Sequence, residues 1–185
     1  MNSYDFDNTI FHPDSSYAFT FFCARRHPFA ALAALPGAAF YGLLHLLKLC
    51  DTKALKQRVF YYLRFIKDPE REAAAFWDKH FPEIEGWYLS QRRDDDIIIS
   101  ASPEFLLRPA ADRLNVRLIG TKMDMKTGKI HGNNCHDSEK VARLKESYPN
   151  AEIESFYSDS LSDEPMARLA KRAYLVKGTK LIPWP

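Results

Sequence analysis

The spacing of apolar residues divides this chain into a helical region and a region where strands and helices alternate. Between about residues 16 and 89 apolar positions recur at helical spacing, and no stretch alternates with a period of two. From residue 97 onward, short β-branched runs are separated by helical segments. That alternation is typical of a buried parallel sheet. We therefore predict an α/β fold with an all-helical insertion after the first strand.

The pattern also predicts individual elements. In the insertion, one apolar stripe predicts a helix over residues 53–67, and Asp-Pro and Phe-Pro pairs bracket a second helix over residues 70–80. In the alternating region, helices are predicted over residues 104–114, 138–147 and 164–172. Strands are predicted over residues 97–99, 116–119, 153–157 and 174–176, with a turn at residues 126–129.

Size and composition exclude several classes of protein. A chain of 185 residues is long enough for one domain, or one domain with an inserted lobe, and its formal net charge of +2 does not favour nucleic-acid binding. The three cysteines are odd in number and widely spaced, with no Cys-x-x-Cys pair, so we expect a reduced, cytosolic setting and no zinc site. The few polar residues before Asp5 do not resemble a secretory signal.

The most informative motif is an Asp-x-Asp-x-Thr run made by Asp5, Asp7 and Thr9, directly after a short apolar start. Two carboxylates at this spacing, where a strand ends and the backbone turns, can face one small site. One can attack phosphorus and bind a hard cation, while the other exchanges a proton with the leaving oxygen and with water. Asp-x-Asp also occurs in calcium loops, but these require a glycine and further oxygen ligands close by.

Each later strand also ends in polar residues suited to phosphate or metal. Because the carboxyl ends of strands in an open α/β sheet form the site, these residues should converge. Ser100 and the backbone N–H groups at the following helix start suit phosphate oxygens, with Ser102 as the alternative ligand. Lys140, at the start of a helix, would neutralise the attacking carboxylate and the phosphate, and Lys122 is the next candidate. Asp159 completes an oxygen-only shell suited to Mg²⁺.

Four segments of the sequence together resemble the motifs of a known family. The segments DFDNT, IIISAS, EKVARL and YSDSLSDEPM, at residues 5–9, 97–102, 139–144 and 157–166, resemble in order and spacing the motifs of the haloacid dehalogenase-like phosphatase superfamily. The insertion after the first motif and the ending of the fourth are similar to the branch that contains phosphoserine phosphatase. The resemblance implies a Rossmann-like three-layer core of parallel strands, residues 1–15 and 90–185, with a small all-helical cap, residues 16–89.

The resemblance also implies a role for each matching position. The residues so assigned are Asp5 as nucleophile, Asp7 as general acid/base, Asp5, Asp7 and Asp159 as Mg²⁺ ligands, Ser100, Ala101 and Lys140 as phosphate ligands, and Thr9, Ser162 and Asp163 as supporting residues. Asp163 would support Lys140 or a metal-bound water.

The chain departs from the phosphoserine phosphatase pattern at two places. Ser162 replaces an Asn of the fourth motif, and Ala101 and Ser102 replace a Gly-Gly pair, which makes phosphoserine itself a doubtful substrate. Asp14 lies nine residues after Asp5, where that branch carries a carboxylate that reads the substrate, but capping a helix before Tyr17 explains it equally well. His12 is close enough to Asp7 in the sequence to border the pocket.

An uncharged stretch of twenty residues, 28–47, meets the length criterion for a membrane span. One crossing would place Asp5 and Asp159 on opposite sides of the bilayer, so we exclude it. Pro36 and Gly37 interrupt the stretch, which favours two short helices in a hairpin that dips into one leaflet. The alternative is that this hairpin is simply half of a cap over the site. Eight basic and two acidic residues between Phe11 and Lys67 favour contact with an anionic surface.

These observations predict a Mg²⁺-dependent phosphomonoester hydrolase that works through an aspartyl-phosphate. The basic residues around the apolar stretch are also similar in arrangement to membrane-associated phosphatidylglycerophosphatases, which implies a lipid phosphate as substrate. The alternatives are a soluble phosphatase for a phosphoserine-like metabolite and a non-catalytic module that binds phosphate or membrane. We expect a cytoplasmic protein, peripheral on the cytoplasmic face of the membrane, with no nucleic-acid partner and no obligate protein partner.

Overall fold

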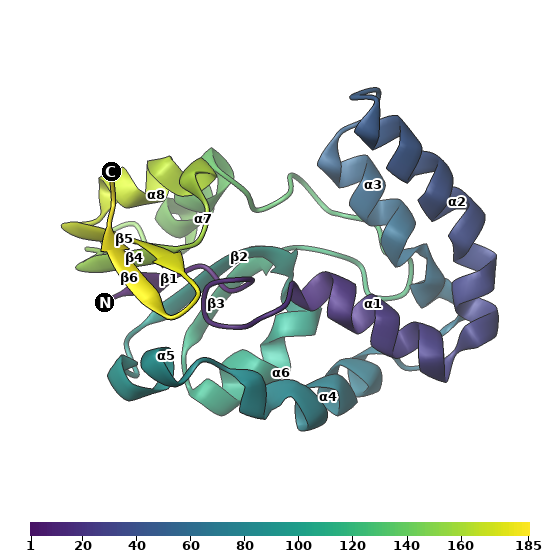
Figure 1. Ribbon diagram of the computed structural model, residues 1–185, viewed down its shortest axis with the longest axis horizontal. Helices are drawn as coiled ribbons and strands as arrows, with labels where there is room; N and C mark the ends of the chain where they lie inside the picture. The colour runs from purple at the N-terminus through teal and green to yellow at the C-terminus, as the bar shows by residue number, and fades with distance from the viewer.

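A six-stranded sheet with its first strand near the middle organises the computed structural model, which describes residues 1–185 (Figure 1). The strand order is β3-β2-β1-β4-β5-β6. Strands β1 to β5 pair in parallel, and β6 pairs antiparallel with β5 at the edge. The strands are β1 (Ser3–Tyr4), β2 (Ile97–Pro103), β3 (Arg117–Thr121), β4 (Ser155–Ser158), β5 (Arg172–Lys177) and β6 (Lys180–Pro183).

Helices cover both faces of this sheet, which confirms the predicted three-layer α/β fold. Successive side chains of a strand point to opposite faces. In β2, Ile97 and Ile99 pack with Leu144 of α7 (Ser138–Ser147) and Met166 of α8 (Glu164–Leu169), whereas Ile98 belongs to the other core with α6 (Glu104–Leu114). The continuous apolar run of β2 therefore reflects burial on both sides.

Part of the helical insertion lies against the core. Helices α1 (Ser15–Arg26) and α4 (Pro69–His80) pack on α6, with α5 (Gly86–Gln91) beside them on the same face of the sheet (Figure 1). The indole of Trp77 donates to the carbonyl of Leu106 at 2.6 Å, which ties α4 to α6. The domain boundaries at residues 15/16 and 89/90 stay a prediction.

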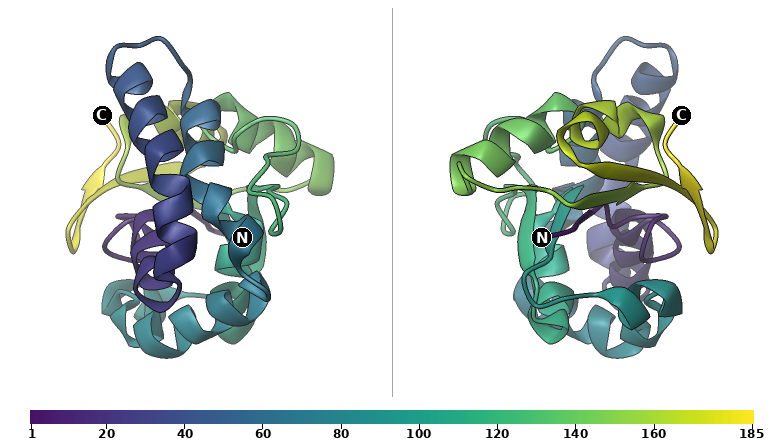
Figure 2. Two further views of the ribbon diagram at one scale, coloured as in Figure 1. Left: turned by 90° about the vertical axis from the view of Figure 1, so that its right-hand side faces the viewer. Right: turned by 90° about the vertical axis from the view of Figure 1, so that its left-hand side faces the viewer.

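The outer part of the insertion is formed by α2 (Pro28–Leu46), α3 (Thr52–Val59) and the 3-10 turn η1 (Phe60–Phe65). In Figure 2 (left) α2 is the element nearest the viewer, with α3 at its side. The interruption predicted at Pro36 is wrong, because α2 is one continuous helix and the hairpin is made by α2 with α3. A proline inside a helix loses one hydrogen bond, about 3 kcal/mol, and packing of α2 along α3 and η1 offsets this.

Most of the other predicted elements are confirmed, with three differences. The single helix predicted over residues 53–67 is wrong in its second half, since α3 ends at Val59 and the aromatic run that follows tightens into η1. Helix α8 ends at Leu169, because Arg172 already starts β5. Strand β6 was not predicted; after the turn at Gly178 only its pairing with β5 defines it. The remaining 3-10 turns are η2 (Phe81–Glu83) and η3 (Leu161–Asp163).

Candidate active site

The carboxyl ends of β1, β2 and β4 meet at one cavity of about 160 Å³. Asp5 directly follows β1, Ser100 lies in β2, and Asp159 directly follows β4. Ten residues named from the sequence line this cavity: Asp5, Asp7, Asp14, Ser100, Ala101, Ser102, Lys140, Asp159, Ser162 and Asp163. Segments that are far apart in the chain thus converge as expected for an open parallel sheet.

Lys140 links two carboxylates at the base of the cavity. Its Nζ atom donates to Asp5 Oδ1 at 2.8 Å and to Asp163 Oδ2 at 2.7 Å, and its side chain is only 2% exposed. Burial opposes the charged form of Lys140, but the carboxylates of Asp5 and Asp163 outweigh it and raise its pKa. Asp163 also accepts a hydrogen bond from the Ser158 hydroxyl at 2.7 Å. The ammonium is therefore held in place beside Asp5.

Asp5 is one of the two buried carboxylates that contact this ammonium. Burial raises the pKa of Asp5 to about 7; Lys140 lowers it and Asp163 raises it further. One of its oxygens accepts from Lys140, and the other has no hydrogen-bond partner in the protein. That free oxygen, fixed at the end of a strand, suits an attacking nucleophile or a metal ligand.

Asp7 is held by contacts from two other elements. Its Oδ1 accepts from the backbone N–H of Ser15 at 2.7 Å, and its Oδ2 accepts from the Ser102 hydroxyl at 2.5 Å. Removal from bulk water raises the pKa of Asp7, and the negative charge of Asp14 raises it further, while both serines lower it. A fixed carboxyl group with a raised pKa is suited to exchange a proton with a leaving oxygen.

The structure gives the two candidate serines different surroundings. The hydroxyl of Ser102 is engaged with Asp7 and lies 2.8 Å from the Ser16 hydroxyl. Ser100 accepts a hydrogen bond from the backbone N–H of Ser102 at 3.1 Å and lines the cavity next to Lys140. The assignment of Ser100 as the phosphate ligand stays a prediction, and its position supports it. Lys122, the alternative to Lys140, lines a different hollow.

Asp159 and Thr9 fix the loop after β4. The Thr9 hydroxyl accepts from the Asp159 backbone N–H at 3.0 Å and donates to Asp159 Oδ1 at 3.4 Å, which leaves the second carboxylate oxygen without a partner. Burial raises the pKa of Asp159. Thr9 itself does not line the cavity. Its buried side chain supports Asp159 from behind.

These oxygens fit Mg²⁺. No three His, Cys, Asp or Glu side chains converge as a complete metal cage. Mg²⁺ does not need one, because it is usually held by one or two carboxylates and keeps several waters. Asp5 and Asp159 each present one oxygen without a protein partner in the same cavity. The residues present are therefore an oxygen-only donor set of the kind that this cation takes.

Lys56 was not identified from the sequence as a residue of the cavity. Lys56 reaches from α3 into the cavity, where its Nζ donates to the carbonyl of Ala101 at 2.9 Å and to Asn134 Oδ1 at 3.2 Å. Burial lowers the pKa of Lys56, and the charges of Asp7 and Asp14 oppose this. The sequence pattern showed only that Lys56 lies off the apolar stripe of its helix. Contact of the cap with the core places it at the site.

The two candidate specificity residues differ in position. Asp14 caps α1 by accepting from the backbone N–H of Tyr17 at 3.1 Å, and it also lines the cavity, so both interpretations of it hold geometrically. His12 does not line the cavity; its Nε2 atom faces Glu85 at 3.9 Å. His136 also lines the cavity, and its Nε2 atom lies 3.2 Å from the Ser162 hydroxyl.

Comparison with known sequences decides the family. A sequence model of the haloacid dehalogenase-like hydrolases matches residues 3–168, which contain all four motifs. The chain belongs to this family. It is therefore a hydrolase, and the cavity at the strand ends is its candidate active site.

One protein of similar sequence and two solved structures of similar fold agree with this assignment. Protein CicA from Caulobacter vibrioides is 29% identical over 91% of this chain and 82% of that protein. A protein of unknown function from Bordetella pertussis Tohama I has a TM-score of 0.77 at 18% identity, covering 95% of this hydrolase and 88% of that chain. A phosphoserine phosphohydrolase-like protein from Francisella tularensis has a TM-score of 0.58 at 16% identity, covering 95% and 87%. These structures share the fold of the hydrolase.

Proposed function

We propose that this hydrolase is a Mg²⁺-dependent phosphatase that cleaves phosphomonoesters through an aspartyl-phosphate on Asp5. The observation that carries the proposal is the ion-paired group of Asp5, Lys140 and Asp163, which shares one cavity with Asp7 and Asp159. Phosphoryl transfer depends mainly on positioning and on charge stabilisation. A fixed nucleophile beside a buried ammonium and a second proton-exchanging carboxyl group supply both.

The protein's own residues account for the two chemical steps. In the first, the free oxygen of Asp5 attacks phosphorus, the bond to the leaving oxygen breaks, and Asp7 gives that oxygen its proton. In the second, Asp7 takes a proton from water as the water oxygen attacks phosphorus, and inorganic phosphate leaves with the Asp5 carboxylate restored. Lys140 and Ser100 would hold the non-bridging phosphate oxygens. Mg²⁺ held by Asp5 and Asp159 would supply further charge stabilisation for the phosphoryl group.

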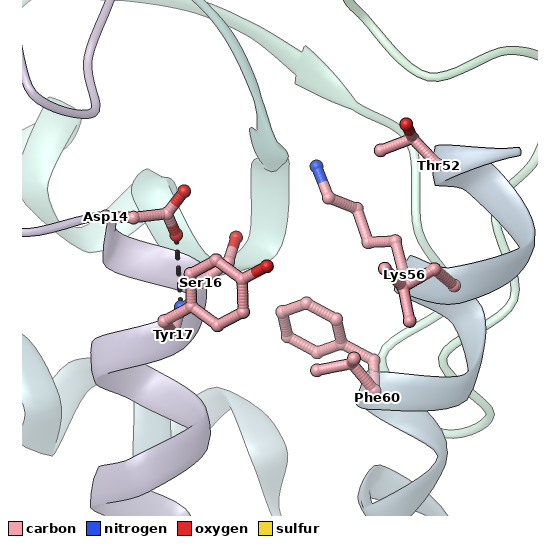
Figure 3. A pocket seen from close by; sticks show the side chains of 8 residues that line it. Asp14, Ser16, Tyr17, Thr52, Lys56 and Phe60 are labelled. Carbon is pink, nitrogen blue, oxygen red and sulfur yellow. Dashed lines mark hydrogen bonds between the residues drawn. The ribbon is translucent and has the colours of Figure 1, made fainter. Parts of the chain in front are cut away.

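A second cavity beside the site supports a lipid phosphate as substrate. It has a volume of about 150 Å³ and lies between α1 and α3, where Tyr17, Leu55, Val59 and Phe60 give it apolar walls. Figure 3 shows Asp14 and the amine of Lys56 on opposite sides of this space. Both residues also line the active-site cavity. An amphiphilic alcohol, such as that of phosphatidylglycerophosphate, would have its polar end at the catalytic cavity and apolar carbons between the two helices.

One observation favours a soluble metabolite as a second candidate. Asp14 and Lys56 are an anion and a cation that line the same space, and this pair would match the amino and carboxylate groups of phosphoserine. The Francisella tularensis neighbour is described as phosphoserine phosphohydrolase-like. Hydrolysis of phosphatidylglycerophosphate and phosphatidic acid in vesicles, measured beside phosphoserine in solution, separates the two candidates.

The catalytic proposal is tested with Asp5→Asn. We expect this variant to lose turnover of p-nitrophenyl phosphate in the presence of Mg²⁺ and to stay folded, because the amide keeps the shape of the side chain and lacks the attacking anion. Asp94→Asn, the same substitution on an exposed loop, is the control and should keep full activity. Full activity in Asp5→Asn, or activity of the wild type that EDTA does not reduce, contradicts the proposal.

A further inference from the structure

Helix α2 presents its large apolar side chains to solvent and its small ones to the protein. Ala30 and Ala34 are its buried residues, and Gly37 lies against the side chain of Arg58. Its exposed large side chains are Phe29, Leu32, Leu35, Phe40, Leu43 and Leu46. Phe29 is 87% exposed and Leu46 is 79% exposed. The outward face, which includes these six residues and no charged residue, is called here the apolar face of α2.

The distribution of side chains on α2 is the reverse of that on an ordinary surface helix of a water-soluble protein. Such a helix buries its large apolar residues and exposes polar ones. Only 11% of the most apolar stretch of α2 is buried inside the protein, although the helix is long and apolar enough to cross a membrane by length and composition. Contiguous exposed apolar area of this kind marks an interaction site. The apolar face is therefore suited to an apolar environment that the chain itself does not provide.

A basic hollow borders the inward side of α2, where Tyr41 is one of its lining residues. It has a volume of about 280 Å³, and its three charged residues are Arg58, Arg64 and Lys129. None of these three cations forms an ion pair, and no carboxylate lines the hollow. The guanidinium of Arg58 lies 4.9 Å from the ring centre of Tyr41 on α2, and that of Arg64 lies 5.0 Å from the ring centre of Tyr61. Planar guanidinium groups with free N–H donors bind phosphate well.

The hollow is held together by contacts between segments distant in the sequence. The turn that carries Lys129 packs on the backbone at the junction of α3 and η1, where a Cβ atom on Gly128 would lie 2.5 Å from the carbonyl oxygen of Phe60. Gly128 has a φ of 70°, which favours glycine as well. The backbone N–H of Ile130 donates to Gln57 Oε1 of α3 at 3.0 Å. Lys129 is thus kept on the same side as the two arginines.

We propose that the apolar face of α2 and the basic hollow together form a docking surface for an anionic phospholipid bilayer. Helix α2 would lie in the plane of the membrane interface, with its apolar face among the upper parts of the acyl chains. A headgroup phosphate would occupy the hollow between Arg58, Arg64 and Lys129. Positive charges near an anionic surface strengthen binding, and aromatic rings at the polar boundary suit such an interface.

Charge complementarity favours the bilayer over a second copy of the chain. A second copy would present the same unpaired cations, whereas anionic headgroups neutralise them. The inward face of α2 is packed on α3 and η1, so the helix lies on one leaflet and does not cross it. The active site, to which α3 contributes Lys56, then stays on the same side of the bilayer as the docking surface.

Vesicle sedimentation tests this proposal without any measurement of turnover, so its outcome is separate from that of the phosphatase proposal. Full-length protein is centrifuged with phosphatidylcholine vesicles that contain or lack phosphatidylglycerol, and without vesicles. We expect binding only with phosphatidylglycerol. Replacing Arg58, Arg64 and Lys129 by Gln together should weaken that binding on the order of 100-fold, because each cation near an anionic surface contributes about a factor of five.

The controls separate the two parts of the surface. Leu32→Gln combined with Phe40→Gln should also weaken binding, although all cations remain. Lys177→Gln combined with Lys180→Gln removes exposed cations from the hairpin of β5 and β6 and should leave binding unchanged. The proposal is overturned if the wild type does not sediment with anionic vesicles, if this hairpin variant loses as much binding as the hollow variant, or if light scattering shows a dimer that Phe40→Gln dissociates.

Discussion

At the scale of single residues, the active-site cavity contains more carboxylates than cations that pair with them. Asp5, Asp7, Asp159 and Asp163 line one cavity, and only Lys140 forms ion pairs within it. Burial raises the pKa values of Asp5, Asp7 and Asp159. Carboxyl groups with raised pKa values that gather in one cavity mark a candidate functional site. A divalent cation and Lys140 together would balance this charge when an anionic phosphate enters.

Lys56 is the residue whose role is most directly testable. Lys56→Met keeps most of the unbranched side chain and removes the cation that α3 places in the cavity. We expect kcat/KM for phosphomonoesters to fall about 10- to 100-fold, since a hydrogen bond to a charged group is worth about 1.5–3 kcal/mol. Steady-state kinetics with p-nitrophenyl phosphate measure the change.

Lys53→Met provides the matched control for this prediction. Lys53 lies on the same helix, and its Nζ donates to the carbonyl of Gly132 outside the active-site cavity. The Lys53→Met substitution therefore removes a contact between the cap and the core without removing a charge from the active-site cavity. Equal losses of activity in the two variants would show that Lys56 only fastens the cap.

At the scale of elements, the junction of α3 and η1 depends on one glycine. Gly128 and Gly178 both have a left-handed backbone, with φ values of 70° and 61°. Only Gly128 is crowded, by the carbonyl of Phe60, whereas nothing lies within 4 Å of a Cβ atom on Gly178. The two positions therefore separate the effect of backbone conformation from that of steric contact.

Replacing each glycine by Ala should give different losses of stability. Gly178→Ala should lower the free energy of unfolding by about 1–2 kcal/mol, because alanine disfavours the left-handed conformation. Gly128→Ala must also displace the turn from Phe60, and we expect a total loss of about 3 kcal/mol or more. Urea unfolding of both variants checks this. Equal losses would mean that the turn moves away from Phe60 without cost.

At the scale of the whole molecule, Glu72 lies where the outer part of the helical insertion meets the helices that pack on the core. This buried carboxylate on α4 lies 2.7 Å from Arg26 Nε at the end of α1 and 3.2 Å from His27 Nε2 before α2. Burial alone would raise the pKa of Glu72, but the hydrogen bond from Arg26 and the nearby His27 ring outweigh it and lower the pKa. Its ionised form therefore stabilises the arrangement of three helices.

The lowered pKa of Glu72 predicts how stability depends on pH. Its contribution is fully present above the ordinary glutamate pKa of about 4.3 and is lost as pH falls through the lower pKa of the folded state. Glu72→Gln should therefore be less stable than the wild type at pH 7, and the difference should shrink between about pH 5 and pH 3. Tm measured across this range tests the sign. A difference that grows on acidification would show that Glu72 is not held as an anion.

The order of strands and helices and most of the residues around the cavity were predictable from the sequence. Asp5 and Asp159 directly follow apolar strands and Ser100 follows the isoleucine run of β2, and parallel strands bring their carboxyl ends together. Local periodicity and motif spacing are short-range properties, so they are visible without the structure. This is why helix α7 and the converging carboxylates were located correctly.

The tertiary structure decided what depends on contacts between distant segments. Pro36 remains inside α2 because α3 and η1 pack along that helix, and Lys56 reaches the site because α3 closes on Ala101. Strand β6 exists only through its pairing with β5. The exposure of the large residues of α2 also followed from packing, since small residues on the other face allow close contact with α3. These outcomes are set by competing long-range contacts, whose free energies local sequence patterns do not contain.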